Sequence, residues 1–440
     1  MGRLVVVSNR VVGPADTRAG GLAIALRAAL AEHGGLWFGW SGRRAAEMAA
    51  RPRQRDGDVE YLTLDLPAAD VEAYYDGFAN RTLWPLLHWR LDLVDYRRDT
   101  QAGYLRVNAQ LADVLARELR PDDRVWVHDY HLIPLGRCLR ERGVGNRLGF
   151  FLHVPLPPAE LLEALPGHRL LFPALASYDL VGFQTERDRQ HLLDYFAATR
   201  PAAPSPRTGT FGVGIDAAGL STLAAAASKR QAVRRLSTSL AGRRLAIGVD
   251  RLDYSKGLPE RFRAFGRHLD RHPGLRGRLT YLQIAPTSRD EVPEYRRLRG
   301  ELDALAGHIN GAHASPDWTP VRYVNRNFGH ELLAGFYRVA DIGLVTPLRD
   351  GMNLVAKEYV AAQDPDDPGV LVLSRFAGAA ADMEEALLVN PHDVDGIADA
   401  IAQAQEMPLA ERRERWEALM ARVAAQDVGA WRRGFLEALG

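Results

Sequence analysis

Short apolar runs alternate with segments of helical periodicity along most of the chain. Several runs, such as residues 4–8 and 245–249, are continuously apolar, which is typical of parallel strands buried on both faces. Repeated strand-then-helix units predict a doubly wound parallel α/β sheet. The strands expected in this way cover residues 4–8, 36–40, 60–64, 124–128, 148–153, 180–183, 245–249, 280–284, 321–324, 342–346, 370–373 and 386–389.

Twelve strands are too many for one comfortable open sheet, so we expect two domains. Residues 200–212 are rich in Pro, Gly and Thr, an Ala/Ser-rich helix containing Lys229 follows, and a strong new strand begins near residue 243. The prediction is therefore two Rossmann-like domains facing a deep cleft, residues 1–234 and residues 235–440. The last helix, about residues 420–440, is expected to pack back on the first domain.

Composition narrows the classes of protein. Of 440 residues, 47% are hydrophobic and 25% charged, which is average for a soluble globular chain. No apolar run approaches the ~18 residues of a membrane span, and 56 basic against 55 acidic residues give no charge excess for nucleic acid or an acidic membrane. A single cysteine, Cys138, excludes an internal disulfide, so a reduced, cytoplasmic protein is expected.

Only three of the basic residues are lysines, and all others are arginine. Arginine and lysine differ where a compact ammonium on a flexible stem is needed, so a lysine kept in such a chain is a mild indication of function. Lys256 and Lys357 lie in the two most unusual motifs, whereas Lys229 is expected to be solvated.

Ligands of parallel α/β sheets bind at the carboxyl ends of the strands, so the residues directly after each strand are the first candidates for a site. Arg10 ends the first strand, and Gly20, with the glycine after it, opens a helix that could receive a phosphate; an ordinary turn is the alternative. Asp129 follows strand 124–128, where its carboxylate could accept from a sugar hydroxyl. His153 ends strand 148–153 and is either a substrate contact or a satisfied core group.

The second half offers a more specific pattern. Arg251 and Lys256 lie on one strand-to-helix connection, where two cations and the helix N-terminus would hold a diphosphate; a surface charge pair is the alternative. Arg289 lies in a loop after strand 280–284. The polar loop 349–353 leads into a helix on which Glu358 could accept from two hydroxyls of a ribose.

Metal and cofactor signatures are missing from the sequence. Two D-x-D triplets, at residues 364–366 and 393–395, do not close a strand, and the second is typical of a helix N-cap. We find no serine elbow, no P-loop and no C-x-x-C. We therefore expect no divalent metal and no cofactor, with Arg251, Lys256 and backbone N–H groups neutralising the diphosphate.

Several motifs taken together resemble the bacterial trehalose-6-phosphate synthases of glycosyltransferase family 20: RLVVVSNR, LWFGWSG, WVHDYHL, RLGFFLHVPLP, RLDYSKGLPERF and GLVTPLRDGMNLVAKEYVAAQ. The resemblance runs from about residue 3 to about residue 430. It implies the two-domain GT-B glycosyltransferase fold and metal-independent transfer of glucose from UDP-glucose to the anomeric oxygen of glucose 6-phosphate, with retention. UDP-glucose would be a co-substrate rather than a cofactor, and a homo-oligomer, in particular a homotetramer, is implied.

The resemblance also implies roles for individual residues. Acceptor binding would use Arg10, Trp40, Tyr75, Trp84, Asp129 and Arg289. Donor binding would use Gly20, Arg251, Lys256, Phe328, Asp350, Gly351, Met352, Asn353, Leu354, Val355 and Glu358. The catalytic group would be Arg251, Lys256, Asp350 and His153.

Retention without an evident carboxylate nucleophile favours a front-face reaction, in which the leaving β-phosphate oxygen takes the acceptor proton. Two alternatives remain open. The same fold could serve another acceptor or donor, as in a glucosylglycerol-phosphate synthase or a pseudo-glycosyltransferase. A non-catalytic sugar-phosphate sensor is the second, although that would predict damage to the Arg251/Lys256 pair or to loop 349–353, and both are intact. UDP-, GDP- and ADP-glucose are all compatible with base recognition by backbone atoms.

Overall fold

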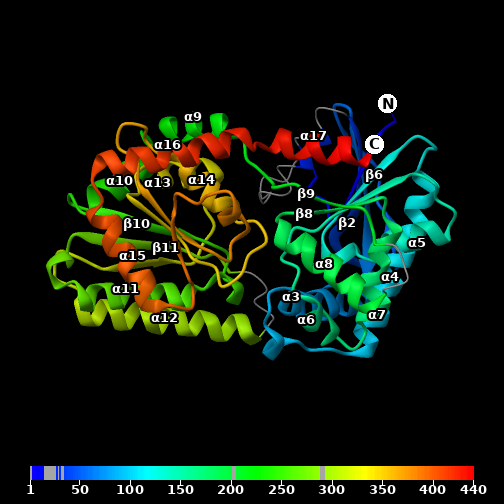
Figure 1. Cartoon of the computed structure of the whole chain (residues 1–440), viewed down its shortest axis with the longest axis horizontal. Helices are drawn as coiled ribbons and strands as arrows, with labels where there is room; N and C mark the ends of the chain where they lie inside the picture. Colours follow the sequence, from blue (N-terminus) through cyan, green and yellow to red (C-terminus); the bar gives the residue numbers. More distant parts are fainter. Residues whose placement is uncertain (1, 14–25, 28, 31–33, 201–204, 288–292) are drawn as a thin grey trace. The chain divides into compact units, whose positions relative to one another are not determined.

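A computed structural model describes residues 2–13, 26–27, 29–30, 34–200, 205–287 and 293–440. The chain divides into two compact units, Met1–Gly212 with Gly429–Gly440, and Val213–Val428 (Figure 1). No helix in these ranges combines the length and the apolar character that crossing a membrane requires.

Within the described residues, the first unit is built on a nine-stranded sheet in the order β3-β5-β2-β1-β6-β7-β8-β9, with β4 beside β5. Its parallel strands are β1 (Leu4–Arg10), β2 (Gly35–Ala45), β5 (Val59–Pro67), β6 (Arg124–His128), β7 (Arg147–Phe151), β8 (Leu180–Phe183) and β9 (Thr208–Thr210). The short strands β3 (Ala49–Ala50) and β4 (Gln54–Asp56) run antiparallel to β5. The chain order reverses between β1 and β6, which is where open α/β sheets bind ligands.

Helices of the first unit follow the strands as the alternating pattern predicts. They are α2 (Ala68–Asp70), the π-helix η1 (Val71–Leu83), α3 (Trp84–Leu87), α4 (Arg98–Glu118), α5 (Leu135–Glu141), α6 (Ala159–Glu163), α7 (His168–Leu171) and α8 (Glu186–Thr199). Short 3-10 turns lie at Leu91–Leu93, Tyr130–Leu132 and Phe172–Ser177.

The helix α17 (Val428–Leu439) completes the core of the first unit (Figure 1). The rings of Trp431 and Phe435 each lie 4.8 Å from the ring of Trp126 on β6. Gly149 and Gly182 leave room for this contact, because a Cβ at either position would lie 2.7 Å from the ring of Phe435. Two strand glycines therefore receive one aromatic side chain of the last helix.

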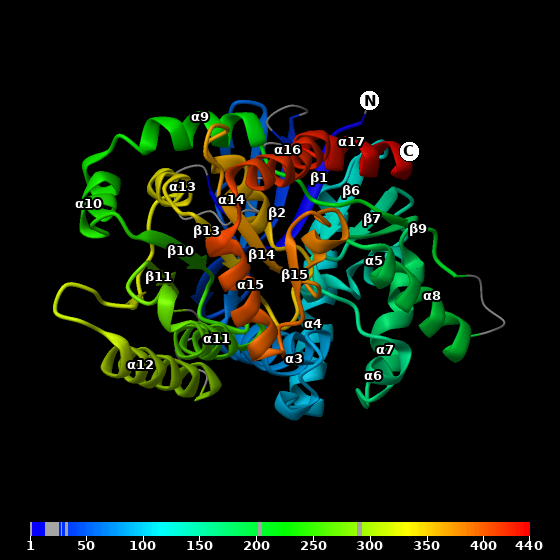
Figure 2. The same ribbon diagram turned by 60° about the vertical axis from the view of Figure 1, so that its left-hand side comes forward.

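As described, the second unit has a fully parallel six-stranded sheet in the order β12-β11-β10-β13-β14-β15 (Figure 2). The strands are β10 (Arg244–Val249), β11 (Leu279–Ile284), β12 (Val321–Val324), β13 (Ile342–Val345), β14 (Val370–Ser374) and β15 (Leu387–Val389). Counted along the chain, this is the 3-2-1-4-5-6 order of the Rossmann fold, and its switch point lies between β10 and β13.

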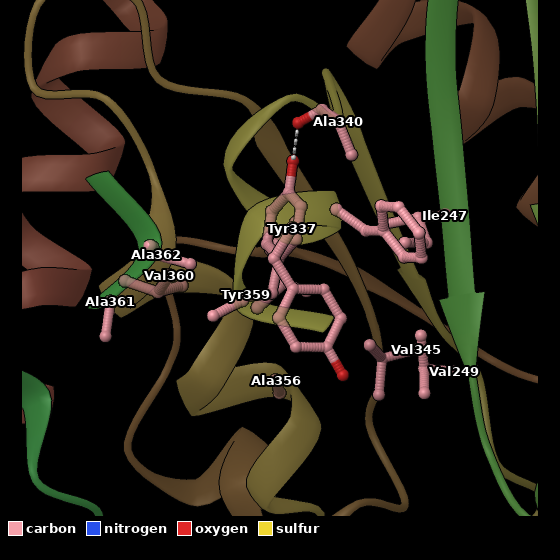
Figure 3. Packing of buried hydrophobic residues seen from close by; sticks show 14 of the residues in the cluster. Ile247, Val249, Tyr337, Ala340, Val345, Ala356, Tyr359, Val360, Ala361 and Ala362 are labelled. Carbon is pink, nitrogen blue, oxygen red and sulfur yellow. Dashed lines mark hydrogen bonds between the residues drawn. The ribbon is translucent and has the colours of Figure 1, made fainter. Parts of the chain in front are cut away.

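Two apolar layers enclose this sheet. One face is covered by α9 (Ala217–Ala227), α10 (Gln231–Ser239), α13 (His330–Arg338), α14 (Leu354–Ala362) and α16 (Leu409–Ala425). The other is covered by α11 (Leu258–Arg271), α12 (Pro293–His313) and α15 (Val394–Glu406) (Figure 1). Figure 3 shows the first layer, in which Ile247 and Val249 of β10 lie near Tyr337 of α13.

The expected strands all form. β2 and β5 run further than predicted, because residues 44–45 pair with residues 66–67, whereas β7 ends at Phe151, two residues earlier than predicted. Three short strands were not expected. β3 and β4 arise from the arginine-rich segment after Trp40, and β9 arises from the Pro/Gly/Thr-rich loop. Neither segment shows the alternation of apolar and polar residues that would predict a strand.

The expected boundary between residues 234 and 235 is wrong, because the structure divides between Gly212 and Val213. Composition changes near residue 235, but packing decides the boundary: Leu220 of α9 and Val233 of α10 lie in the core of the second unit. The helix expected to contain Lys229 also differs. It is broken by a turn at residues 228–230, which places the exposed lysine between α9 and α10.

Candidate active site

Three of the residues expected at strand ends in the first unit are found there. Arg10 is the last residue of β1, Asp129 directly follows β6, and His153 lies two residues beyond the end of β7 rather than at its last position. Asp129 has a left-handed backbone (φ 76°), and its carboxylate oxygen Oδ1 accepts a hydrogen bond from the backbone N–H of His153 at 3.3 Å. The strained turn therefore joins two neighbouring strand ends.

A chain of aromatic rings brings the expected acceptor residues together around the loop that follows β6. The ring of Trp40 on β2 lies 5.4 Å from that of Tyr75 on η1, and Tyr75 lies 5.9 Å from His131. On the other side, the ring of Trp84 in α3 lies 5.8 Å from that of Tyr130. Tyr130 and His131 directly follow Asp129. The aromatic side chains of β2, η1 and α3 therefore lie in the same part of the first unit as Asp129.

Arg10 is exposed and lies over a glycine. Gly42 has φ 82°, and a Cβ there would lie 2.6 Å from Nε of Arg10. The indole N–H of Trp40 donates to the carbonyl of Arg43 at 2.8 Å in the same segment. A solvent-accessible cation beside an aromatic wall is suited to the phosphate and ring of a sugar phosphate.

His153 and His128 form a buried pair. Nε2 of His153 lies 3.0 Å from Nδ1 of His128, and the rings of Trp126, Phe151 and Trp431 surround them. Burial lowers the pKa of His153 to about 3 and that of His128 well below its usual range, with the neighbouring ring as a further cause for His128. Both are neutral at pH 7, and within the described residues Nδ1 of His153 has no hydrogen-bond partner.

In the second unit, two loops meet at the switch point. Arg251 is exposed on the β10–α11 loop, and Lys256 ends that loop just before α11. Lys256 forms a salt bridge with Asp350 on the β13–α14 loop, and the carbonyl of Ser255 accepts from the N–H of Leu348 at 2.8 Å. The ammonium expected to await a diphosphate therefore already has a carboxylate partner, and the two loops form one framework.

The β13–α14 loop is fixed by its own polar groups. Asp350 accepts from Nδ2 of Asn353 at 3.2 Å and, through its other oxygen, from the N–H of Met352 at 3.3 Å. Asn353 has φ 68° and caps α14 by accepting from the N–H of Ala356 at 3.2 Å. The carbonyl oxygen of Gly351 lies close to Gly378, since a Cβ atom at position 378 would be only 1.8 Å from that oxygen.

The remaining expected donor residues lie along α14 and beside it. Leu354 is the first residue of α14, and Glu358 is half-buried within it; burial raises the pKa of Glu358, while nearby His330 lowers it. Phe328 and Val355 both pack against the same core layer as α14. Gly20 and Arg289, expected at the two phosphates, lie outside the described residues.

No group of three or more His, Cys, Asp or Glu side chains in the described ranges could hold a metal ion.

The sequence expectations did not include Arg261 of α11. This residue is fully buried behind Lys256, and its guanidinium pairs with the carboxylate of Asp250 at 2.7 Å. The signal was present, because Arg261 falls on the same helical face as Leu258 and Phe262.

Comparison with known proteins agrees with this architecture. The model of "Glycosyltransferase family 20" matches residues 8–440. A trehalose-6-phosphate synthase of Sinorhizobium fredii is 50% identical, over 100% of this chain and 98% of the relative. An alpha,alpha-trehalose-phosphate synthase (UDP-forming) of Burkholderia xenovorans, solved in complex with glucose-6-phosphate, has a TM-score of 0.96 at 46% identity, over 100% of both chains. The Escherichia coli protein bound with UDP-2-fluoro glucose has a TM-score of 0.95 at 46% identity, over 100% of this chain and 99% of that one.

Two Rossmann-like units with polar strand ends at both switch points define a glycosyltransferase of the GT-B fold. The expected fold class is thereby confirmed. The chain belongs to glycosyltransferase family 20, among the UDP-forming trehalose-6-phosphate synthases.

Proposed function

We propose that this protein transfers glucose from UDP-glucose to the anomeric oxygen of glucose 6-phosphate, releasing UDP and α,α-trehalose 6-phosphate. Relatives solved with glucose-6-phosphate and with UDP-2-fluoro glucose support the pair of substrates. The observation in this chain that carries the proposal is the bonded pair of loops at the β10/β13 switch point, with Arg251 and Lys256 on one and Asp350 on the other.

Most of the proposed donor ligands belong to the second unit. Arg251, Lys256 and the N-terminus of α11 would hold the diphosphate, since cations and helix N-termini both favour an anion. Glu358 would accept from the ribose hydroxyls, and Phe328 and Val355 would contact the base beside the backbone of Leu354. Asp350, Gly351, Met352 and Asn353 would face the glucose, with Gly20 completing the donor set.

Most of the proposed acceptor ligands belong to the first unit. Arg10 would hold the 6-phosphate, assisted by Tyr75 and by Arg289, because guanidinium–phosphate contacts are charge-assisted and often bidentate. Trp40 and Trp84 would provide the walls for the sugar ring. Asp129 would accept from a hydroxyl of glucose 6-phosphate, and His153 would meet a hydroxyl of the transferred glucose.

We further propose retention by a front-face reaction without a metal. The acceptor oxygen attacks on the face that UDP leaves, and the leaving β-phosphate oxygen takes its proton. Asp350 is a poor nucleophile, because both carboxylate oxygens accept hydrogen bonds from the protein. The residues therefore act by positioning and by stabilising the departing diphosphate, for which Arg251 and Lys256 supply the charge.

The experiment combines a panel of substrates with variants of two of the three lysines of the chain, Lys256 and Lys229. UDP-, ADP- and GDP-glucose are each offered with glucose 6-phosphate, glucose or glycerol 3-phosphate, and products are identified by NMR. Lys256→Met should lower kcat by about 100- to 1000-fold, as loss of a transition-state donor does. Lys229→Met, at an exposed turn, should leave kcat unchanged.

Each outcome separates the hypotheses. Trehalose phosphate as the main product supports the proposal, whereas preference for glycerol 3-phosphate or another donor indicates an altered specificity. Absence of turnover with retained sugar-phosphate binding indicates a sensor. Turnover that EDTA abolishes and magnesium restores would contradict metal independence.

A further inference from the structure

A buried arginine ties together the strand ends on which the proposed donor site is built. Arg261 of α11 is 0% exposed, and its Nη1 donates to Oδ2 of Asp250 at 2.7 Å and to Oε1 of Gln283 at 3.0 Å. Its Nε donates to Oγ1 of Thr346 at 3.0 Å. These three partners lie on, or directly after, β10, β11 and β13, which are adjacent in the sheet. One guanidinium thus spans three strand ends.

The fourth contact of Arg261 reaches the loop that carries the proposed diphosphate ligands. Nη2 donates to the backbone carbonyl of Lys256 at 3.3 Å. Lys256 in turn pairs with Asp350 on the loop after β13. That loop begins at Thr346, which accepts a hydrogen bond from the guanidinium of Arg261. Arg261 therefore bonds to both loops of the switch point from behind.

The strand makes space for this side chain. A Cβ at Gly248 of β10 would lie 2.7 Å from Nη1 of Arg261 and 2.4 Å from Oε1 of Gln283. Any other residue at this position would push the guanidinium away from its partners. The fold therefore uses a glycine within a central strand to let a charged group cross it.

A charged pair in a core is costly to desolvate, and apolar side chains of similar volume often stabilise a fold as well or better. The pair of Arg261 and Asp250 carries no net charge, so its attraction for a diphosphate is weak. The planar guanidinium has hydrogen-bond donors in fixed directions, so it can hold its acceptors in a defined geometry. These facts favour a role in placing other groups over a role in stability or in direct charge stabilisation.

We propose that Arg261 is a positioning residue for glycosyl transfer, which holds the Lys256 loop and the β13 end so that the Lys256 ammonium meets the diphosphate in a fixed place. This inference rests on the proposed function, because it assumes that Lys256 contacts the diphosphate. Arg261 itself touches no substrate.

A double-mutant cycle tests the proposal in the full chain. Arg261→Met should lower kcat by about 100-fold, as small displacements of a catalytic group do. In a Lys256→Met background the same change should cost less than about threefold, because residues that act through one another are not additive. The KM for glucose 6-phosphate should stay within about twofold.

The control is an arginine at the opposite end of the same strand. Arg243, just before β10, donates to the carbonyl of Gly277 at 3.0 Å and pairs with Asp317. Arg243→Met removes a similar set of contacts far from the switch point, and kcat should remain at the level of the unmodified enzyme. A loss of kcat equal to that of Arg261→Met would show a general structural effect and overturn the proposal.

Two further variants separate charge from geometry and guard against failure to fold. Arg261→Lys keeps the charge but lacks the fork, so kcat should stay low; full activity would overturn the proposal. Thr346→Val removes one acceptor and leaves the ion pair in place. Thr346→Val should lower kcat several-fold in the native background and leave it unchanged in the Lys256→Met background. If Arg261→Met does not fold, an unchanged kcat in Thr346→Val would contradict the inference.

The cycle distinguishes this inference from the function beneath it. Near-normal kcat in Lys256→Met would refute the diphosphate role of that lysine, whatever Arg261 does. A slow Lys256→Met enzyme combined with a fast Arg261→Met enzyme, or with effects that multiply in the double variant, would overturn the positioning role alone.

Discussion

Lowering the pH from 7 to 5 should destabilise the first unit through the buried pair of His128 and His153. The pKa of His153 is about 3 in the fold, against about 6.5 in an unfolded chain. Below pH 6.5 the unfolded state binds the proton and the folded state does not, so stability falls as the pH falls. At ~1.4 kcal/mol per pH unit, His153 alone accounts for about 2 kcal/mol at pH 5. His128 adds to the loss, because burial lowers its pKa too.

Urea unfolding at pH 7 and pH 5, followed by tryptophan fluorescence, measures this change. Trp126 and Trp431 lie against the pair and report its surroundings. His153→Gln should lose about 2 kcal/mol less between the two pH values than the unmodified chain. His308→Gln, at an exposed position of α12, should behave as the unmodified chain does. Equal losses in His153→Gln and the unmodified chain would refute the reasoning.

Three further predictions concern single positions. Gly257→Ala should cost about 1–3 kcal/mol of stability and lower kcat, because φ is 63° and the new Cβ would lie 2.4 Å from the carbonyl of Thr346; chemical denaturation and kinetics measure both effects. Glu358→Gln should raise the midpoint of thermal unfolding at pH 7, since burial disfavours the ionised carboxylate, and should weaken UDP binding by about 10- to 100-fold in calorimetry; unchanged affinity would contradict the ribose role. Phe435→Ala should cost about 3–5 kcal/mol in urea unfolding, and a change smaller than about 1 kcal/mol would show that α17 is not part of the core.

The sequence was most informative where a strand end decides the position of a side chain. Arg10, Asp129, Arg251 and Lys256 could be nominated from apolar runs alone, because parallel strands bring their carboxyl ends to one edge. Two D-x-D triplets were also separated correctly from strand ends, and Asp393 caps α15 by accepting from the N–H of Gly396 at 2.9 Å.

What the pattern could not supply was contact between elements that are distant in the chain. Tyr75 and Trp84 lie on helices whose placement against the sheet no local periodicity fixes, and only the resemblance indicated them. Lys256 looked like a free cation because Asp350 is 94 residues away. The charge of Arg261 on an apolar helical face indicates a buried polar contact, but its role follows only from its partners on three strands.

The position of α17 has a consequence for how the protein is made. Residues 429–440 belong to the first unit, yet the ribosome releases them after the whole of the second unit. Until then the indole of Trp126 and the glycine-lined gap between β7 and β8 are without the Phe435 side chain that fills them. Domains usually fold as they emerge, N-terminal first. Here the first unit to be synthesised is the last to be finished, and its nascent sheet is an expected client for chaperones that bind exposed apolar surface.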